Sequence, residues 1–222
     1  MLKSRTLRAV LFDLDGTLVD SAPDLFAALV SLRAARALPE PDYAAVRPYA
    51  SRGALGMIEA GFADHPELDR NQLRDEFLDF YAQHLWVRSS PFSGIDPLLD
   101  GLAEHGLGLA VVTNKLERFA APLVAAAGWA ERFACVVGGD SAARPKPHPA
   151  PVLEACRRLS IHPGNALMVG DDARDIEAGR LAGAATAAVT WGYLPPGEEP
   201  ASWGADGVLD DPMELLESFF HQ

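Results

Sequence analysis

The chain has 222 residues, of which 49% are apolar, and its 19 basic and 31 acidic residues leave a net charge of −12. This composition is typical of a globular protein that is long enough to bury a core without disulfides or a structural metal. The excess of acidic residues argues against a nucleic-acid partner, because such binding depends on clustered Lys and Arg. The two cysteines, Cys135 and Cys156, lie too far apart for a C-x-x-C motif and indicate neither a disulfide framework nor a zinc site.

The first predicted element is a short buried strand over Ala9–Phe12. Asp13 and Asp15 interrupt the apolar run directly after it, so the run is too short for an export signal or a membrane span. We therefore expect a cytoplasmic protein with no membrane partner.

The next stretch, residues 20–92, contains no convincing strand. Ser21, Pro23 and Asp24 predict a helix start, because a hydroxyl can cap a free N–H, Pro suits the first turn, and a carboxylate suits its positive end. The prolines of segment 38–41 are expected to end that helix. Further along, apolar residues recur at helical spacing. They are Leu73, Phe77, Phe80, Tyr81 and Leu85. We predict an all-helical insertion.

Short apolar runs recur after the insertion and predict further buried strands. They are Leu107–Val112, Phe133–Val137, Ala166–Val169 and Ala184–Val189, with a weaker one at Gly207–Leu209. Helical patterns alternate with these runs. They cover Leu116–Ala127, Ala150–Leu159 and Arg174–Ala182, and a last helix is expected over Met213–Phe219. This alternation predicts an α/β fold, a doubly wound core built on a parallel sheet.

The candidate site follows from the strand ends, because ligands of open parallel sheets bind beyond the carboxyl ends of the strands. The first strand leads into Asp13 and Asp15, two carboxylates that Gly16 follows with a tight turn. This pattern indicates paired catalytic carboxylates. A capped turn with solvated acids is the alternative, since Asp and Gly are common turn residues.

Two further segments carry groups that could bind an anion. Thr113, Asn114 and Lys115 follow the second core strand, where a hydroxyl, an amide and a helix start could donate hydrogen bonds. Alternatively, Thr113 or Asn114 is an ordinary helix N-cap. Lys146 lies among the three prolines of segment 144–149, which stiffen the chain. It is either an ammonium aimed into a site or an exposed lysine.

A second group of acids follows the fourth core strand. Asp171 and Asp172 come directly after it, and Asp175 lies in the next turn. Such carboxylates repel one another unless a cation compensates, and oxygen-only groups favour Mg²⁺ over zinc. Acids that merely favour a helix dipole are the alternative. Together, the four segments predict in-line phosphoryl transfer, which needs a nucleophile, a cation, a fixed lysine and hydrogen-bond donors.

In these residues the chain resembles the haloacid dehalogenase superfamily of aspartate-nucleophile phosphotransferases. The four motifs of that family match residues 13–17, residues 113–114, Lys146 and residues 170–175. The resemblance implies a Rossmann-like core over residues 1–19 and 93–222 and a helical cap over residues 20–92. This organisation agrees with the helical insertion expected from the apolar pattern.

The resemblance also implies roles for the motif residues. Asp13 would attack phosphorus and form an aspartyl phosphate, while Asp15 would protonate the leaving oxygen and later deprotonate the attacking water. Thr113 and Lys146 would hold the phosphoryl oxygens, and Asn114 belongs to the same catalytic set.

The cofactor that the resemblance implies is Mg²⁺. Asp13, the backbone carbonyl of Asp15 and Asp171 would bind it. Either Asp172 or Asp175 would support the ion directly or from its outer shell, and the sequence leaves open which of the two does so.

Within the superfamily, residues 12–25 look like the opening of phosphoglycolate phosphatases, which suggests a small carboxylated phosphoester. Residues 113–120, together with segments 188–193 and 203–206, look closer to N-acetylmuramic acid 6-phosphate phosphatases, which is the alternative. In the cap, Arg52 could pair with a substrate carboxylate. Gly53 would permit close backbone approach there. Arg52 could equally be an ordinary surface residue.

Three competing functions remain. A haloalkanoate dehalogenase would need neither the second acid Asp15 nor the cation ligand Asp171. A phosphosugar mutase is expected to carry a Glu-Asp-Ser pattern, and residues 170–175 of this chain depart from that pattern. A signalling phosphoacceptor domain would not turn over a phosphoester, and the long insertion favours an enzyme. We expect a small anionic phosphomonoester as the partner and a monomer or homodimer.

Overall fold

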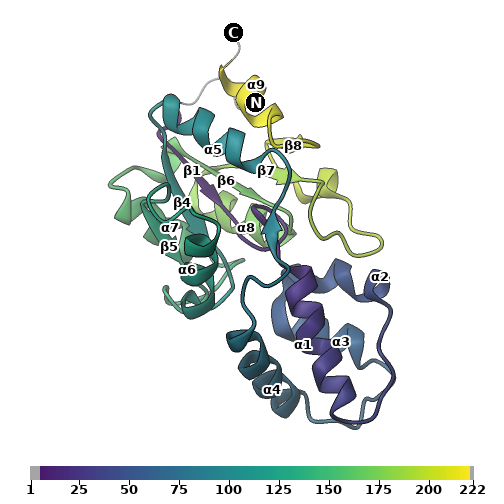
Figure 1. Cartoon of the computed structure of the whole chain (residues 1–222). Coiled ribbons are helices and arrows are strands. Elements are labelled where there is room, and N and C mark those ends of the chain that lie inside the picture. The colour runs from purple at the N-terminus through teal and green to yellow at the C-terminus, as the bar shows by residue number, and fades with distance from the viewer. Residues whose placement is uncertain (1–5, 221–222) are drawn as a thin grey trace.

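The computed structural model describes residues 6–220, and its centre is a sheet of six parallel strands (Figure 1). The strands lie in the order β5-β4-β1-β6-β7-β8. Their bounds are β1 Ala9–Phe12, β4 Gly108–Val112, β5 Cys135–Val137, β6 Ala166–Gly170, β7 Ala185–Val189 and β8 Gly207–Leu209. The predicted α/β fold is confirmed. The predicted third core strand is shorter than expected, because the structure begins it at Cys135 instead of Phe133.

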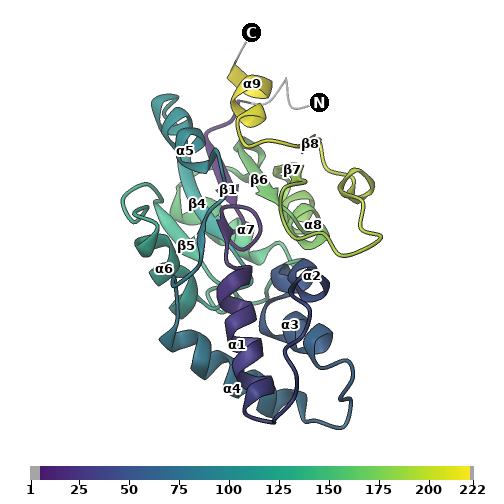
Figure 2. The ribbon, with the colours of Figure 1, turned by 45° about the vertical axis from the view of Figure 1, so that its right-hand side comes forward.

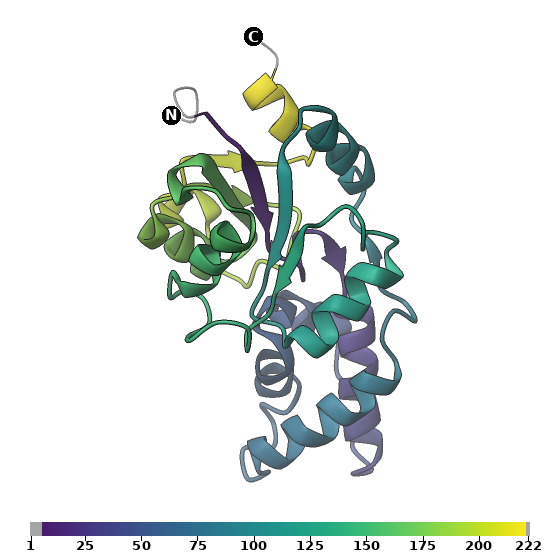
Figure 3. The ribbon, with the colours of Figure 1, turned by 90° about the vertical axis from the view of Figure 1, so that its left-hand side faces the viewer.

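Helices cover both faces of the sheet (Figure 3). Side chains along β1 alternate between the two faces. Val10 and Phe12 point into one cluster and Leu11 into another. The first cluster contains side chains of α5, α6 and α9, and the second those of α7 and α8. These helices span α5 Ile95–Glu104, α6 Glu117–Ala126, α7 Ala150–Arg158, α8 Ala173–Ala182 and α9 Glu214–Phe220. Because both faces are covered, the strands are apolar at almost every position.

The insertion forms a helical unit beside the carboxyl ends of the strands (Figures 1 and 2). It contains α1 Ala22–Ala34, α2 Tyr43–Val46, the 3₁₀ helix η2 Arg47–Arg52, α3 Gly53–Gly61 and α4 Arg70–Gln83. These elements share their own apolar cluster, which Phe119 and Tyr193 of the core complete. An antiparallel ribbon of β2 (Val19–Asp20) and β3 (Ser90–Pro91) joins the unit to the sheet. This ribbon supports our proposal that residues 20–92 are the cap.

The start of α1 differs from the expectation. Ser21 is the N-cap residue, but its side chain makes no capping hydrogen bond, because its hydroxyl donates to Asp15 Oδ1 instead. Asp24 lies in the first turn as expected, yet it is buried and accepts hydrogen bonds from segment 87–89. The helix ends at Ala34, before the prolines that were expected to end it.

Within residues 6–220, no helix has both the length and the apolar character that crossing a bilayer requires. Cys135 and Cys156 are free thiols, as the sequence indicated.

Candidate active site

The first strand delivers Asp13 and Asp15 to the edge of the sheet that faces the cap. The N–H of Asp13 donates to the carbonyl of Val169 at 2.9 Å, so β6 still holds the backbone of Asp13 directly after the end of β1. Gly16 turns the chain with φ of +91°. A Cβ at Gly16 would lie 2.1 Å from Asp171 Oδ2, so glycine is required both by the turn and by the close approach of the two loops.

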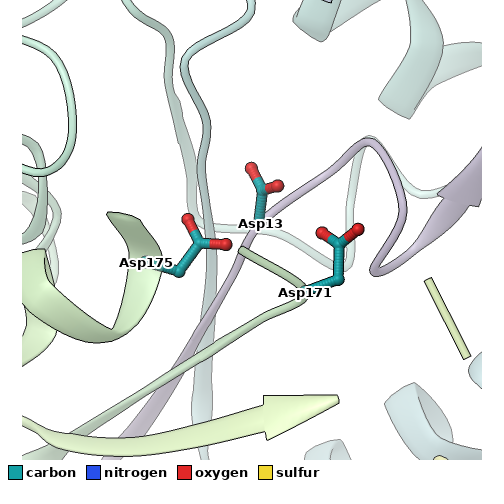
Figure 4. Close-up of side chains that lie close together, drawn as sticks. All are labelled: Asp13, Asp171 and Asp175. Carbon is teal, nitrogen blue, oxygen red and sulfur yellow. The ribbon is translucent and has the colours of Figure 1, made fainter. Parts of the chain in front are cut away.

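Three buried carboxylates meet here: Asp13, which follows β1, and Asp171 and Asp175, which both follow β6 (Figure 4). One oxygen from each lies within 4.8 Å of the others. Burial and the neighbouring carboxylates raise the pKa of Asp171 well above its ordinary value, and burial likewise raises that of Asp175. Carboxylate oxygens gathered in this way fit a hard divalent cation, which would remove their mutual repulsion.

Asp171 is held in place from three directions. Thr17 Oγ1 donates to its Oδ1 at 3.2 Å, and the N–H of Tyr193 and Ser51 Oγ donate to its Oδ2 at 2.9 Å and 2.6 Å. Tyr193 belongs to the segment after β7 that looked like N-acetylmuramic acid 6-phosphate phosphatases. Its side chain links that segment to the ribbon of β2 and β3, because its hydroxyl donates to Asp20 at 2.7 Å.

Lys146 supplies a buried positive charge to the carboxylates. Its Nζ lies 2.8 Å from Asp13 Oδ1, 2.5 Å from Asp175 Oδ1 and 2.6 Å from the carbonyl of Val112. Burial alone would lower the pKa of this ammonium, but Asp13 and Asp175 raise it above its ordinary value. The structure therefore shows Lys146 as an ammonium that points toward the buried carboxylates and not as an exposed lysine.

Asn114 fixes the position of that lysine through the backbone. Its Nδ2 donates to the carbonyl of Lys146 at 2.9 Å, and its Oδ1 accepts from the N–H of Lys146 at 2.8 Å. Thr113 is buried at the end of β4, and its Oγ1 accepts from the N–H of Lys115 at 3.2 Å. Neither residue is the N-cap of α6, which is Leu116.

Asp15 has partners of its own, separate from the carboxylate cluster. Lys115 Nζ lies 3.0 Å from its Oδ1 and 3.2 Å from its Oδ2, and Ser21 Oγ also donates to it. Lys115 lies 4.6 Å from the ring centroid of Tyr81, on the cap helix α4. Burial raises the pKa of Tyr81 to about 12, and the structure offers its buried hydroxyl no hydrogen-bond partner within residues 6–220.

The structure separates the two residues that the sequence left as alternatives. Asp175 belongs to the carboxylate cluster. Asp172 instead holds the guanidinium of Arg174, with Oδ1 at 2.8 Å and Oδ2 at 2.7 Å, and caps α8. Arg174 in turn donates to the carbonyl of Ser51 in the cap at 2.9 Å. Asp175 also completes the capping box of α8 by accepting from the N–H of Asp172.

A cavity of about 190 Å³ lies between these groups and the cap. Arg52 and Gly53 both line it, as do Tyr81 and Arg74 from α4. Arg52 is 44% exposed and forms an ion pair with Glu198 at 3.4 Å. At Gly53, φ of 64° and ψ of −154° favour glycine, whereas an added Cβ would meet open space. The expected close approach of a substrate to the backbone of Gly53 stays a prediction.

Sequence reasoning missed Ser51, Arg74 and Tyr81, and it found no partner for Lys115. For Tyr81 the helical apolar pattern was the only signal, and it indicated a core position. The other three are polar residues whose neighbours come from distant segments, so no local pattern marks them.

Comparisons with known proteins agree with this geometry. The haloacid dehalogenase-like hydrolase family model matches residues 10–189. An N-acetylmuramic acid 6-phosphate phosphatase from Pseudomonas aeruginosa is 48% identical over 97% of this chain and 96% of its own. A phosphoglycolate phosphatase from Xanthomonas campestris is 40% identical over 95% of both chains.

Among solved structures, a predicted phosphoglycolate phosphatase from Haemophilus somnus superposes with a TM-score of 0.86 at 30% identity. The superposition covers 97% of this chain and 99% of the other. The family, the fold and the enzyme class expected from the motifs are thus confirmed. The chain belongs to the haloacid dehalogenase-like hydrolases, as a phosphatase of that family.

Proposed function

We propose that the protein hydrolyses a phosphomonoester through an aspartyl phosphate on Asp13. The observation that carries this proposal is that the two carboxylates after the first strand, Asp13 and Asp15, have different partners. Lys146 holds Asp13 Oδ1, while within residues 6–220 no hydrogen bond reaches Oδ2, which leaves that oxygen to attack phosphorus. Asp15 lies outside the carboxylate cluster with its own partners, which suits a group that exchanges a proton with the substrate.

The proposed reaction has two steps. Asp13 Oδ2 forms a bond to phosphorus as the bond to the leaving oxygen breaks, and Asp15 gives that oxygen its proton. Water next attacks the same phosphorus, Asp15 takes its proton, and the bond to Asp13 breaks to release phosphate. Thr113 and Lys146 lie where they could bind the phosphoryl oxygens, and Asn114 holds Lys146 in position.

The carboxylate cluster fits Mg²⁺, which Asp13, Asp171, Asp175 and the backbone carbonyl of Asp15 would hold. When bound, the ion neutralises the charge of the phosphoryl group. Asp172 has a different role in this proposal, because Arg174 occupies both of its oxygens.

We propose N-acetylmuramic acid 6-phosphate as the substrate, ahead of the phosphoglycolate that the opening motif suggested. The support is the 48% identity to the phosphatase of that name from P. aeruginosa, together with 46% identity to another from P. putida. The cavity supports the same substrate, because cap side chains such as Leu25, Phe77 and Leu78 form an apolar part of the cavity wall. A sugar with apolar substituents would cover such a wall better than a two-carbon acid.

Arg74 is our candidate for binding the carboxylate of this substrate. Its neighbours on one face of α4, Phe77, Leu78 and Tyr81, line the same cavity. Within residues 6–220 no ion pair or hydrogen bond is recorded for its guanidinium, whereas Glu198 engages Arg52 and Asp172 engages Arg174. A free guanidinium suits a planar carboxylate. Arg52 and Gly53 would then border the same subsite.

The test is kcat/KM for phosphate release from three compounds: N-acetylmuramic acid 6-phosphate, N-acetylglucosamine 6-phosphate and 2-phosphoglycolate. Asp13→Asn serves as the blank. We expect the first to be preferred, since the second has the same phosphorylated amino sugar without the carboxylate. A preference for 2-phosphoglycolate would contradict the substrate proposal. If none of the three compounds released phosphate, neither the amino-sugar phosphates nor phosphoglycolate would be the substrate.

The Arg74→Ala variant tests the carboxylate subsite. It should lower kcat/KM for the muramic compound by about 10- to 100-fold, the loss expected for one hydrogen-bonded charge pair, and leave N-acetylglucosamine 6-phosphate unchanged. Arg144→Ala is the matched control, because Arg144 is exposed and lies outside the residues that line the cavity. Equal losses for both sugars would exclude Arg74 from carboxylate binding.

A further inference from the structure

A hydroxyl from the cap reaches the carboxylates that would hold the cation. Ser51 lies at the end of η2, and its Oγ is 2.6 Å from Asp171 Oδ2 and 3.3 Å from the backbone carbonyl of Asp15. The carbonyl of Asp15 and the carboxylate of Asp171 are both expected to bind the cation. The cap therefore contacts the proposed metal site directly.

A second contact holds the same residue from the core side. Arg174 Nη2 donates to the backbone carbonyl of Ser51 at 2.9 Å, and Asp172 orients that guanidinium with both of its oxygens. The backbone and side chain of one cap residue are thus bound to α8 and to the loop after β6. By contrast, the neighbouring Arg52–Glu198 ion pair is long and exposed, and such pairs contribute little.

We infer that Ser51 couples docking of the helical cap to binding of the divalent cation. Its hydroxyl orients the Asp171 carboxylate for the cation only while the cap is docked, so the docked state should bind the cation more tightly. Groups that orient metal ligands in this way typically change affinity by 10- to 100-fold. Thermodynamic reciprocity requires that the bound cation stabilise the docked cap by the same factor. Ser51 is a positioning residue, since it acts through Asp171.

The experiment measures Mg²⁺ binding without any substrate, by isothermal titration calorimetry on the full chain. Ser51→Ala should raise the Kd for Mg²⁺ by about tenfold or more, whereas Ser51→Thr, which keeps the hydroxyl, should retain most of the affinity. Ser31→Ala is the matched control. Ser31 is a half-buried serine on α1 of the cap, and no hydrogen bond links its hydroxyl to the carboxylates described above. Circular dichroism verifies that each variant is folded.

Hydrogen–deuterium exchange supplies the reciprocal readout. Adding Mg²⁺ to the wild type should slow amide exchange in residues 47–56, and the same addition to Ser51→Ala should slow it much less. Helix α5, at the far end of the core from the cap, serves as the internal reference (Figure 1). The inference is overturned if Ser51→Ala binds Mg²⁺ as tightly as the wild type, or if Mg²⁺ protects the segment equally in both.

The inference rests on the proposed cation site but not on the proposed substrate. If the wild type binds no Mg²⁺, both the cofactor assignment and the inference fail. If the wild type binds Mg²⁺ and Ser51→Ala binds it equally, only the inference fails and the proposed function stands.

Discussion

Asp24, which was expected only to favour the start of α1, instead accepts four hydrogen bonds, and Asp24→Asn tests what they contribute to stability. Its buried carboxylate accepts hydrogen bonds from the N–H groups of Val87, Arg88 and Ser89 at 3.0, 2.8 and 3.0 Å, and from Ser89 Oγ at 2.6 Å. These bonds attach the start of α1 to the loop that leads into β3 and back to the core. Both connections between cap and core therefore meet at one carboxylate.

The expected cost follows from these four bonds. Asparagine can keep its oxygen toward the three donors at Oδ2, but its NH₂ group then faces the N–H of Arg88. One charge-assisted bond worth about 2 kcal/mol is lost. The other three become neutral hydrogen bonds, and each of them is weakened by about 1 kcal/mol. Relaxation will recover part of this sum, so we expect a loss of about 3–5 kcal/mol. That is a large fraction of the 5–15 kcal/mol typical of a whole domain.

Urea unfolding monitored by circular dichroism would measure this change, and thermal unfolding should show a Tm lower by about 10 °C. Asp42→Asn is the matched control. Asp42 is also a cap aspartate, but it accepts one exposed hydrogen bond, from the N–H of Ala44 at 3.0 Å, and Asn caps a helix as well as Asp does. If Asp24→Asn were as stable as Asp42→Asn, the role assigned to these hydrogen bonds would be refuted.

Four further outcomes are expected. Asp13→Asn should nearly abolish phosphate release without changing the circular dichroism spectrum, and a folded variant with near-wild-type turnover would remove Asp13 as the nucleophile. Asp15→Asn should lower kcat by about 10²- to 10⁴-fold, and an unchanged kcat would exclude it as the acid/base. Lys115→Met breaks the buried ion pair with Asp15 and should cost about 3 kcal/mol in urea unfolding, whereas an unaltered midpoint would show that the pair is not stabilising. Because burial raises the pKa of Asp171 and Asp175, the folded metal-free protein binds more protons than the unfolded chain, and their contribution to stability falls as pH rises from about 4 toward neutrality. Mg²⁺ should therefore raise Tm more at pH 8 than at pH 5, and an equal rise at both would contradict the carboxylate assignment.

The sequence by itself determined the fold class and the position of the site. Buried parallel strands must be apolar on both faces, so runs such as Ala9–Phe12 stand out without any structure. Loops at the carboxyl ends of such strands meet at one edge, so Asp13, Lys146 and Asp171 could be placed together from their order alone. The structure brings these groups together as predicted, with Lys146 Nζ 2.8 Å from Asp13.

Only the tertiary structure decided how these groups are held and which neighbours complete them. Asp172 and Asp175 are the same residue type in one motif, and only the structure distinguishes them, because Arg174 binds Asp172 and Lys146 contacts Asp175. Ser51 lies 120 residues before Asp171 in the chain. No local periodicity encodes a contact over that separation, because it depends on the docking of the cap against the sheet, and docking is a property of the packed molecule.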